Sequence, residues 1–314
     1  MKAATHRARN RRAAADFILG DATHGEAAMA NANTLETTAR VGYAARGIVY
    51  MIVGGLAVMA AVGAGGDTGG SRSALASLID EPFGKALLAV IALGLVAFAV
   101  WREVAALTDA DRRGTSGKGL AVRAAHVISG IVYLSLAVYA AGLAFGWATG
   151  GGGSGDEGAQ GWSAWLMAKP FGRWLLGLVG LGIAGAGVGF LVRAWKGDVT
   201  KHLHYAPAQR GWVVPLGRAG FAARGIVFLI IGGFLVVAAW QAQSSEARGL
   251  GGALRTLQEQ PYGWILLALV AAGLFAFGAF GVVQAVYRRI DAPDIDDAAG
   301  DAKRAAQRGA RKVS

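Results

Sequence analysis

The chain contains one sequence pattern three times, and this internal repeat limits the possible folds more than any other feature. The first copy begins at Arg40 and the third at Arg218, and both read Arg-x-Gly-aromatic-Ala-Ala-Arg-Gly-Ile-Val-aromatic. A weaker copy begins at Arg123. Each opening leads into a long apolar stretch, a short polar stretch, a proline and a second apolar run. Two apolar runs per unit indicate a helical hairpin, and tandem copies indicate a repeat architecture.

The composition places these hairpins in a membrane. Hydrophobic residues make up 54% of the chain and charged residues only 16%, whereas soluble domains carry about a quarter charged residues. A helix needs about 20 apolar residues to cross the hydrocarbon layer. The stretches without Asp, Glu, Lys or Arg are 47–66, 86–101, 124–155, 174–192, 225–245 and 262–287. We therefore predict an all-α polytopic membrane protein with six transmembrane helices.

The second half of each repeat begins with Pro-aromatic-Gly, at Pro82, Pro170 and Pro261. Because proline fits the first turn of a helix, we expect it to open the second span of each hairpin. Leucines precede Pro82 and Pro261 at helical spacing, which favours a short amphipathic helix on the membrane surface. An irregular loop is the alternative.

Basic residues predict the orientation. Arg and Lys gather in segments 1–40, 102–123, 193–218 and 288–314, and few lie in the three opposite connections. The positive-inside rule then puts both termini in the cytoplasm of a bacterial inner membrane. All nine tryptophans lie near span ends, as expected of an interfacial aromatic belt. A net charge of +11 would suggest nucleic acid in a soluble protein. Here the basic residues lie between spans, and no nucleic-acid partner is expected.

The predicted organisation has three hairpins between two tails. Two spans per repeat return the chain to the same side, so the copies are parallel and related by an approximate threefold axis along the membrane normal. Abundant glycine, at 49 residues, favours close helix packing. The predicted divisions are a disordered basic tail at 1–39, repeats at 40–107, 123–196 and 218–289, and a charged tail at 290–314. The tails are expected either to touch anionic lipid or only to enforce the topology.

Arg46 and Arg224 are the candidate site residues. They hold equivalent positions just inside two spans, and an ionisable group within a span is a functional hypothesis by default. Their guanidinium groups either extend to the cytoplasmic headgroups or bind an anion such as a lipid phosphate, whose geometry suits them. The lipid bilayer is the expected partner, with anionic phospholipid as a candidate ligand, and the sequence names no protein partner.

Other motifs indicate no catalysis, cofactor or metal. Gly180, Gly182 and Gly185 match a dinucleotide-binding pattern, but they lie inside a predicted span without a preceding strand, so helix packing explains them. His202 and His204 stand in a polar loop, where solvated histidines are commoner than metal ligands. The chain has no cysteine. No nucleophile with an adjacent base is evident, so we expect no enzyme.

The two strong openings carry a family resemblance. Gly42-Tyr43-Ala44-Ala45-Arg46-Gly47 and its counterpart at 220–225, with the Pro-aromatic-Gly second halves, resemble a bacterial membrane family called domain of unknown function 1206. The weaker copy departs from that motif at Ala125, His126 and Ser129. The resemblance covers about residues 40–290. The resemblance implies tandem two-helix repeats. It implies no activity, because the family has none assigned.

Taken together, the sequence predicts an integral membrane protein with a structural, scaffolding or lipid-interacting role. The alternative is a transporter or channel with a path along the pseudo-threefold axis, and an enzyme acting on lipid ranks third. Polar residues along an open axis would favour transport, whereas a closed, glycine-packed axis would favour the structural role.

Overall fold

The computed structural model describes residues 33–109, 114, 116–147, 155–197, 199, 203 and 209–287. Most of both predicted tails, and the His202 and His204 pair, lie outside these residues. Six described helices are long and apolar enough to cross a membrane. They are Asn33–Ala61, α3 (Gly84–Leu107), α4 (Gly117–Phe145), α6 (Gly172–Lys196), α7 (Arg210–Gln241) and α9 (Gly263–Tyr287). The prediction of an all-helical protein with six spans is confirmed.

Two spans begin earlier than expected. Residues 33–39, which we placed in the disordered tail, are helical and continue into the first span. Glu36 and Arg40 form an ion pair one turn apart, which stabilises this extension. Helix α7 begins at Arg210 rather than near residue 218 and contains Pro215. The charge-free stretches therefore underestimated the helices, because polar residues can occupy a helix end outside the hydrocarbon layer.

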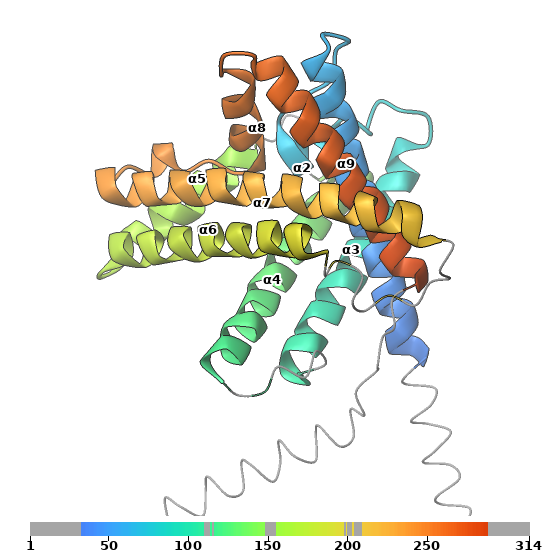
Figure 1. Ribbon diagram of the computed structural model, residues 1–314, viewed down its shortest axis with the longest axis horizontal. Helices are drawn as coiled ribbons and strands as arrows, with labels where there is room; N and C mark the ends of the chain where they lie inside the picture. Colours follow the sequence, from blue (N-terminus) through green and yellow to red (C-terminus); the bar gives the residue numbers. More distant parts are fainter. Residues whose placement is uncertain are drawn as a thin grey trace, which may run out of the picture.

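Neighbouring repeats pack through equivalent helix pairs, two of them through glycines. The first helix meets α9 where a Cβ on Gly47 would lie 2.6 Å from the Gly278 carbonyl oxygen. Helix α7 meets α6 in the same way, because a Cβ on Gly225 would lie 2.9 Å from the Gly187 carbonyl oxygen. The third such pair is α4 with α3, and Figure 1 shows both labelled pairs running side by side. The first helix of each repeat thus packs against the second helix of the repeat before it, and the first repeat packs in the same way against the third. This pattern confirms the approximate threefold arrangement.

Contacts within a repeat are less regular. In the first and third repeats the two spans touch, with Gly42 against the Phe98 backbone and Gly220 against the Phe277 backbone. In the second repeat, α4 and α6 are not among the closely packed helix pairs of the described residues. Figure 1 shows these two helices diverging. Pseudosymmetry is therefore broken at one place.

Three short helices cover one end of the bundle. They are α2 (Gly70–Ala76), α5 (Gly155–Met167) and α8 (Leu250–Gln258), and each contacts the other two. This end is called the short-helix side below, and the end where the first helix begins and α9 finishes is the terminal side. The short helices are confirmed. Trp162 and Trp165 of α5 are exposed, whereas the leucines of α2 and α8 point inward. Leu75 and Leu254 have no exposed surface, so these helices cover the core instead of lying on lipid.

The three prolines occupy tight turns before the second spans. Gly84 N–H donates to the Glu81 carbonyl, and Phe83 has φ of 62°. These values define a type II turn with proline at its second position. Proline is favoured there because its ring presets φ. Our expectation of proline within the first helical turn was wrong by two residues, since the helix begins at the glycine.

The aromatic residues of these turns are exposed. Phe83, Phe171 and Tyr262 all have positive φ values and largely exposed side chains. Positive φ is unfavourable for a bulky side chain. Their location at span ends suits aromatic side chains at a membrane interface. The tryptophans follow this pattern, except that Trp101 is buried in the core.

Candidate functional site

Arg46 lies in the interior of the bundle, in the middle of the first helix. Its side chain is buried, at 9% exposure, and its guanidinium carbon is 5.1 Å from the Tyr43 ring centroid, 4.9 Å from that of Phe98 and 5.2 Å from that of Phe277. Nη2 donates a hydrogen bond of 3.0 Å to Oε1 of Gln284, a buried residue of α9. The aromatic π-faces attract the cation, and they come from three helices.

Arg224 has a similar environment in the third repeat. Its guanidinium carbon lies 4.7 Å from the Phe277 ring centroid and 4.9 Å from that of Phe228. Tyr50 and Phe190 complete the ring of aromatic neighbours, at 5.3 and 5.2 Å. Phe277 therefore contacts both arginines, and its aromatic ring is shared by the two guanidinium groups. The structure thus brings both predicted site residues together.

The tyrosines join this cluster through hydroxyl groups. Tyr133 on α4 hydrogen-bonds with the Arg224 guanidinium and with Tyr50. Tyr50 and Tyr133 hold equivalent positions in the first and second repeats, and Phe228 holds the third. Ser129 stands in the second repeat where the others have Arg46 and Arg224. Of the three equivalent repeat positions in this layer, two therefore carry a guanidinium group, and a further arginine, Arg102, lies 5.7 Å from the Phe98 ring.

Several donors of the two arginines have no partner. Nε of Arg46 and both Nε and Nη1 of Arg224 are inaccessible and make no hydrogen bond. Within the described residues, no carboxylate pairs with either side chain; the ion pairs seen there join Arg40 to Glu36 and Arg255 to Asp156. A buried charge without a counter-charge is costly. The cluster therefore has the chemistry of a site for an anion.

A second arginine layer lies closer to the terminal side. Arg40, Arg123 and Arg218 open the three repeats, and each guanidinium donates to carbonyls at the end of another repeat's second span. Arg123 Nε donates to the Ala106 oxygen at 2.6 Å and Arg218 Nε to the Ala194 oxygen at 2.8 Å. Arg40 Nη1 donates to the Ala285 oxygen at 2.8 Å. Cations at helix C-termini are stabilising, so these arginines stabilise the contacts between neighbouring repeats.

This layer also gives the depth of the site. Arg46 follows Arg40 by six residues, about 9 Å along the helix axis. Arg40, Arg123 and Arg218 mark the start of each copy in the sequence, but the pattern alone assigns them no role. Their repetition at one position was the available signal. Gln284 and Tyr133 gave none, because they contact the arginines only through packing between different repeats, and Phe277 reaches Arg46 in the same way.

The short-helix side holds a buried carboxylate of its own. Asp156 is 3% exposed. Its Oδ1 accepts hydrogen bonds from the backbone N–H groups of Gly249 at 2.7 Å and Gly252 at 3.0 Å, and Oδ2 pairs with Arg255. An acidic side chain at a helix N-terminus is stabilising. Asp156 thus fastens α5 to α8 and is part of the closed end.

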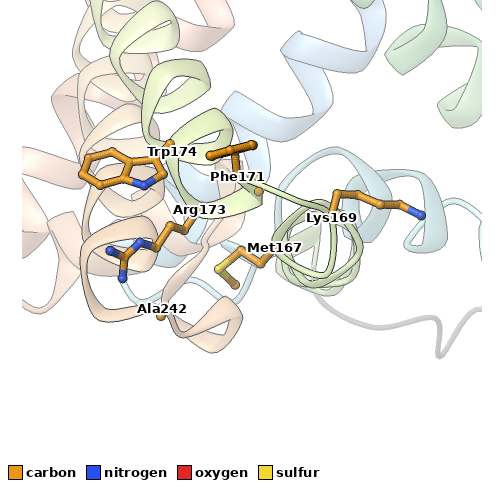
Figure 2. Close-up of a pocket in the computed structure, with 7 residues that line it drawn as sticks. Met167, Lys169, Phe171, Arg173, Trp174 and Ala242 are labelled. Atoms are coloured by element: carbon orange, nitrogen blue, oxygen red, sulfur yellow. The ribbon is translucent and has the colours of Figure 1, made fainter.

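A surface cavity of about 410 Å³ lies near the start of α6, between Met167, Lys169, Arg173, Trp174 and Ala242. Figure 2 shows the Lys169 side chain pointing away from that of Arg173. The two charges therefore do not converge on one ligand. The glycine pattern at Gly180 is helical, and Gly180 packs on Gly232 of α7 as expected, whereas a Cβ on Gly182 or Gly185 would meet nothing within 4 Å.

Comparisons with known proteins place the chain in a family. A model described as Domain of Unknown Function (DUF1206) matches residues 41–109, 124–197 and 219–288. The chain is 35% identical over 254 residues to the uncharacterized protein YxxB of Bacillus subtilis (strain 168), covering 80% of this chain and 90% of that protein. No solved structure matches it. With its three matched repeats and six spans, the chain belongs to the DUF1206 family of integral membrane proteins.

Proposed function

We propose that this protein binds a phosphate-bearing anion between Arg46 and Arg224, within the cytoplasmic half of a bacterial inner membrane. One observation carries the proposal: two buried guanidinium groups share the Phe277 ring, retain unpartnered donors and have no carboxylate partner among the described residues. An anion would supply the missing charge and accept the free hydrogen bonds. The role is one of binding, and no catalytic step is assigned to any residue.

Phosphate fits this cluster better than a smaller anion. Guanidinium groups offer paired N–H donors that match two oxygens of one phosphate. Arg46 and Arg224 come from different repeats and present donors from separate helices, so an anion with several oxygens can contact both. The proposed ligand is therefore a phosphate group, either free or carried by a lipid.

The proposed orientation rests on charge. The terminal side carries Arg40, Arg123 and Arg218 and the predicted basic loops, whereas the short-helix side has few basic residues. The positive-inside rule then assigns the terminal side, and both termini, to the cytoplasm. Arg46 and Arg224 follow the terminal-side arginines by six residues, which supports a site in the half of the membrane nearer that side.

A binding role is better supported than a path along the axis. The short helices α2, α5 and α8 meet over one end of the bundle. Large side chains without exposed surface, including Leu88, Leu95, Phe98 and Leu274, lie in the core beneath them. Such a closed, packed end favours holding a ligand over conducting one.

The test is the phosphorus content of the purified protein. We expect Arg46→Gln/Arg224→Gln protein, which keeps polar side chains but loses both charges, to lose most of the phosphate bound by the wild type. Arg173→Gln on the exposed surface is the matched control and should retain it. Native mass spectrometry, with phosphorus measured before and after solvent extraction, separates lipid phosphate from free phosphate. Equal phosphate in the double variant and the wild type would overturn the proposal.

A further inference from the structure

One face of α6 lacks the partner that its counterparts have. Gly94 and Gly273 occupy the same repeat position as Gly182, twelve residues after the proline. A Cβ on Gly94 would lie 2.3 Å from the Ala45 Cβ, and one on Gly273 would lie 2.4 Å from the Ala223 Cβ. A Cβ on Gly182 would meet nothing within 4 Å. Gly185 and Gly189 on α6 are equally open.

The matching face of α4 is also uncovered. Val132 is 57% exposed, whereas its counterparts Val49 and Val227 are 1% and 2% exposed. Ile128 stands where the other repeats have Ala45 and Ala223, and it is 62% exposed. An isoleucine there is too large for the close approach that alanine allows. The second repeat is therefore built so that α4 and α6 stay apart.

These two faces border the arginine cluster. Phe190, next to Gly189 on α6, is one of the rings around Arg224, at 5.2 Å. Tyr133, next to Val132 on α4, hydrogen-bonds with Arg224. Both uncovered faces thus adjoin the residues around Arg224, and the glycine face of α6 extends from there toward the short-helix side. Gly182 lies seven residues, or about 10 Å, further along α6 than Gly189.

We propose that the bound anion is a phospholipid that enters from the bilayer between α4 and α6. Its phosphate contacts Arg46 and Arg224, and one acyl chain lies along Gly182, Gly185 and Gly189. The inference rests on the proposed anion site and adds the identity and entry route of the ligand. An apolar face that continues directly from a buried cationic cluster matches a molecule with a charged head and an apolar tail.

The direction of the lipid agrees with this placement. A phospholipid of the terminal-side leaflet has its phosphate toward the terminal side and its chains toward the bilayer centre. The arginines lie nearer the terminal side, and the glycine face runs from them toward the short-helix side. A free phosphate ion would not cover the apolar face. A second protein copy packed on that face would not supply an acceptor for the guanidinium donors.

The experiment fills the uncovered face without touching the arginines. Gly185→Leu/Gly189→Leu places two side chains where the structure has open space, so the fold should be unaffected. Gly55→Leu/Gly233→Leu is the matched control, because those glycines are equally open on other helices. Each protein is reconstituted in nanodiscs of palmitoyl-oleoyl phosphatidylglycerol and extracted into neutral detergent, and retained lipid is counted by native mass spectrometry. Inorganic phosphate binding to delipidated protein is measured by calorimetry.

We expect the face-filled variant to retain about tenfold less lipid than the control, a change of 1.4 kcal/mol in binding free energy, with phosphate binding unchanged. Equal lipid retention in the two glycine variants, with phosphate still bound, would overturn the lipid route and leave the anion site standing. Wild type that binds neither lipid nor phosphate would instead overturn the anion site itself. A wild-type dimer that becomes monomeric only in the face-filled variant would show a second copy on this face, against the proposal.

Discussion

At the scale of single residues, the aromatic rings around Arg46 and Arg224 offset only part of the cost of burying two like charges. A desolvated cation–π contact contributes about 2 kcal/mol or more, and removing a guanidinium from water costs several kcal/mol. The rings also do nothing to cancel repulsion between the cations. The residues of the cluster therefore stabilise each cation individually but leave the pair in need of negative charge.

Phe277 is the residue on which both cations depend. Phe277→Leu should lower the melting temperature, because it removes the ring shared by Arg46 and Arg224 and its edge contacts with Tyr50 and Phe221. We expect a loss of about 1–3 kcal/mol, typical of a substitution that disturbs a packed core. Phe275→Leu makes the same chemical change on an exposed part of α9 and should be nearly neutral. Thermal unfolding in detergent compares the two, and equal losses would contradict this role.

The arginine pair could be found from the sequence, but its surroundings could not. Arg46 and Arg224 were visible because each is a charge inside an apolar run at a repeated position. Gln284 and Tyr133 are uncharged and lie on α9 and α4, so only the packing of different repeats brings them to the arginines. Sequence periodicity indicates which side of a helix is apolar, but it does not say which helix covers that side.

At the scale of helices, glycine position decides which neighbours can pack closely. Gly187 and Gly185 lie two residues apart on α6 with opposite surroundings. A Cβ on Gly187 would meet the Gly225 carbonyl oxygen at 2.8 Å, whereas a Cβ on Gly185 would meet nothing within 4 Å. The same residue type therefore has a packing role at one position and leaves a free face at the other.

This difference predicts unequal effects of one substitution. Gly187→Ala should destabilise the protein by about 1–3 kcal/mol, because the added methyl forces α6 away from α7. Gly185→Ala should be neutral or slightly stabilising, because alanine is the better helix former. Thermal unfolding of the two purified variants in the same detergent is the measurement. A destabilised Gly185→Ala protein, or an unaffected Gly187→Ala protein, would contradict the packing of α6.

The spans and the short helices of this fold follow from the sequence because they depend on local patterns. The turn at Pro82 was misjudged because its type depends on the positive φ of Phe83, which a bulky residue rarely adopts. The separation of α4 from α6 was also missed. Ile128 in place of alanine was visible, but its consequence depends on how closely two helices must approach.

At the scale of the whole molecule, three hairpins form a cycle that is closed on one side and interrupted at one seam. The first helix closes the cycle against α9, the short helices cover one end, and the second repeat leaves α4 and α6 apart. The loss of an arginine at Ser129 and the open seam both occur in this second repeat. Departures from symmetry therefore coincide with the proposed route to the site.

The central claim is that a phosphate group lies between Arg46 and Arg224. Solid-state NMR tests it directly, by dephasing of guanidinium nitrogen-15 signals by phosphorus-31 in arginine-labelled protein within phosphatidylglycerol bilayers. We predict strong dephasing in the wild type that is lost in Arg46→Gln/Arg224→Gln and retained in Arg173→Gln. Dephasing that is the same in the wild type and the double variant would contradict the account.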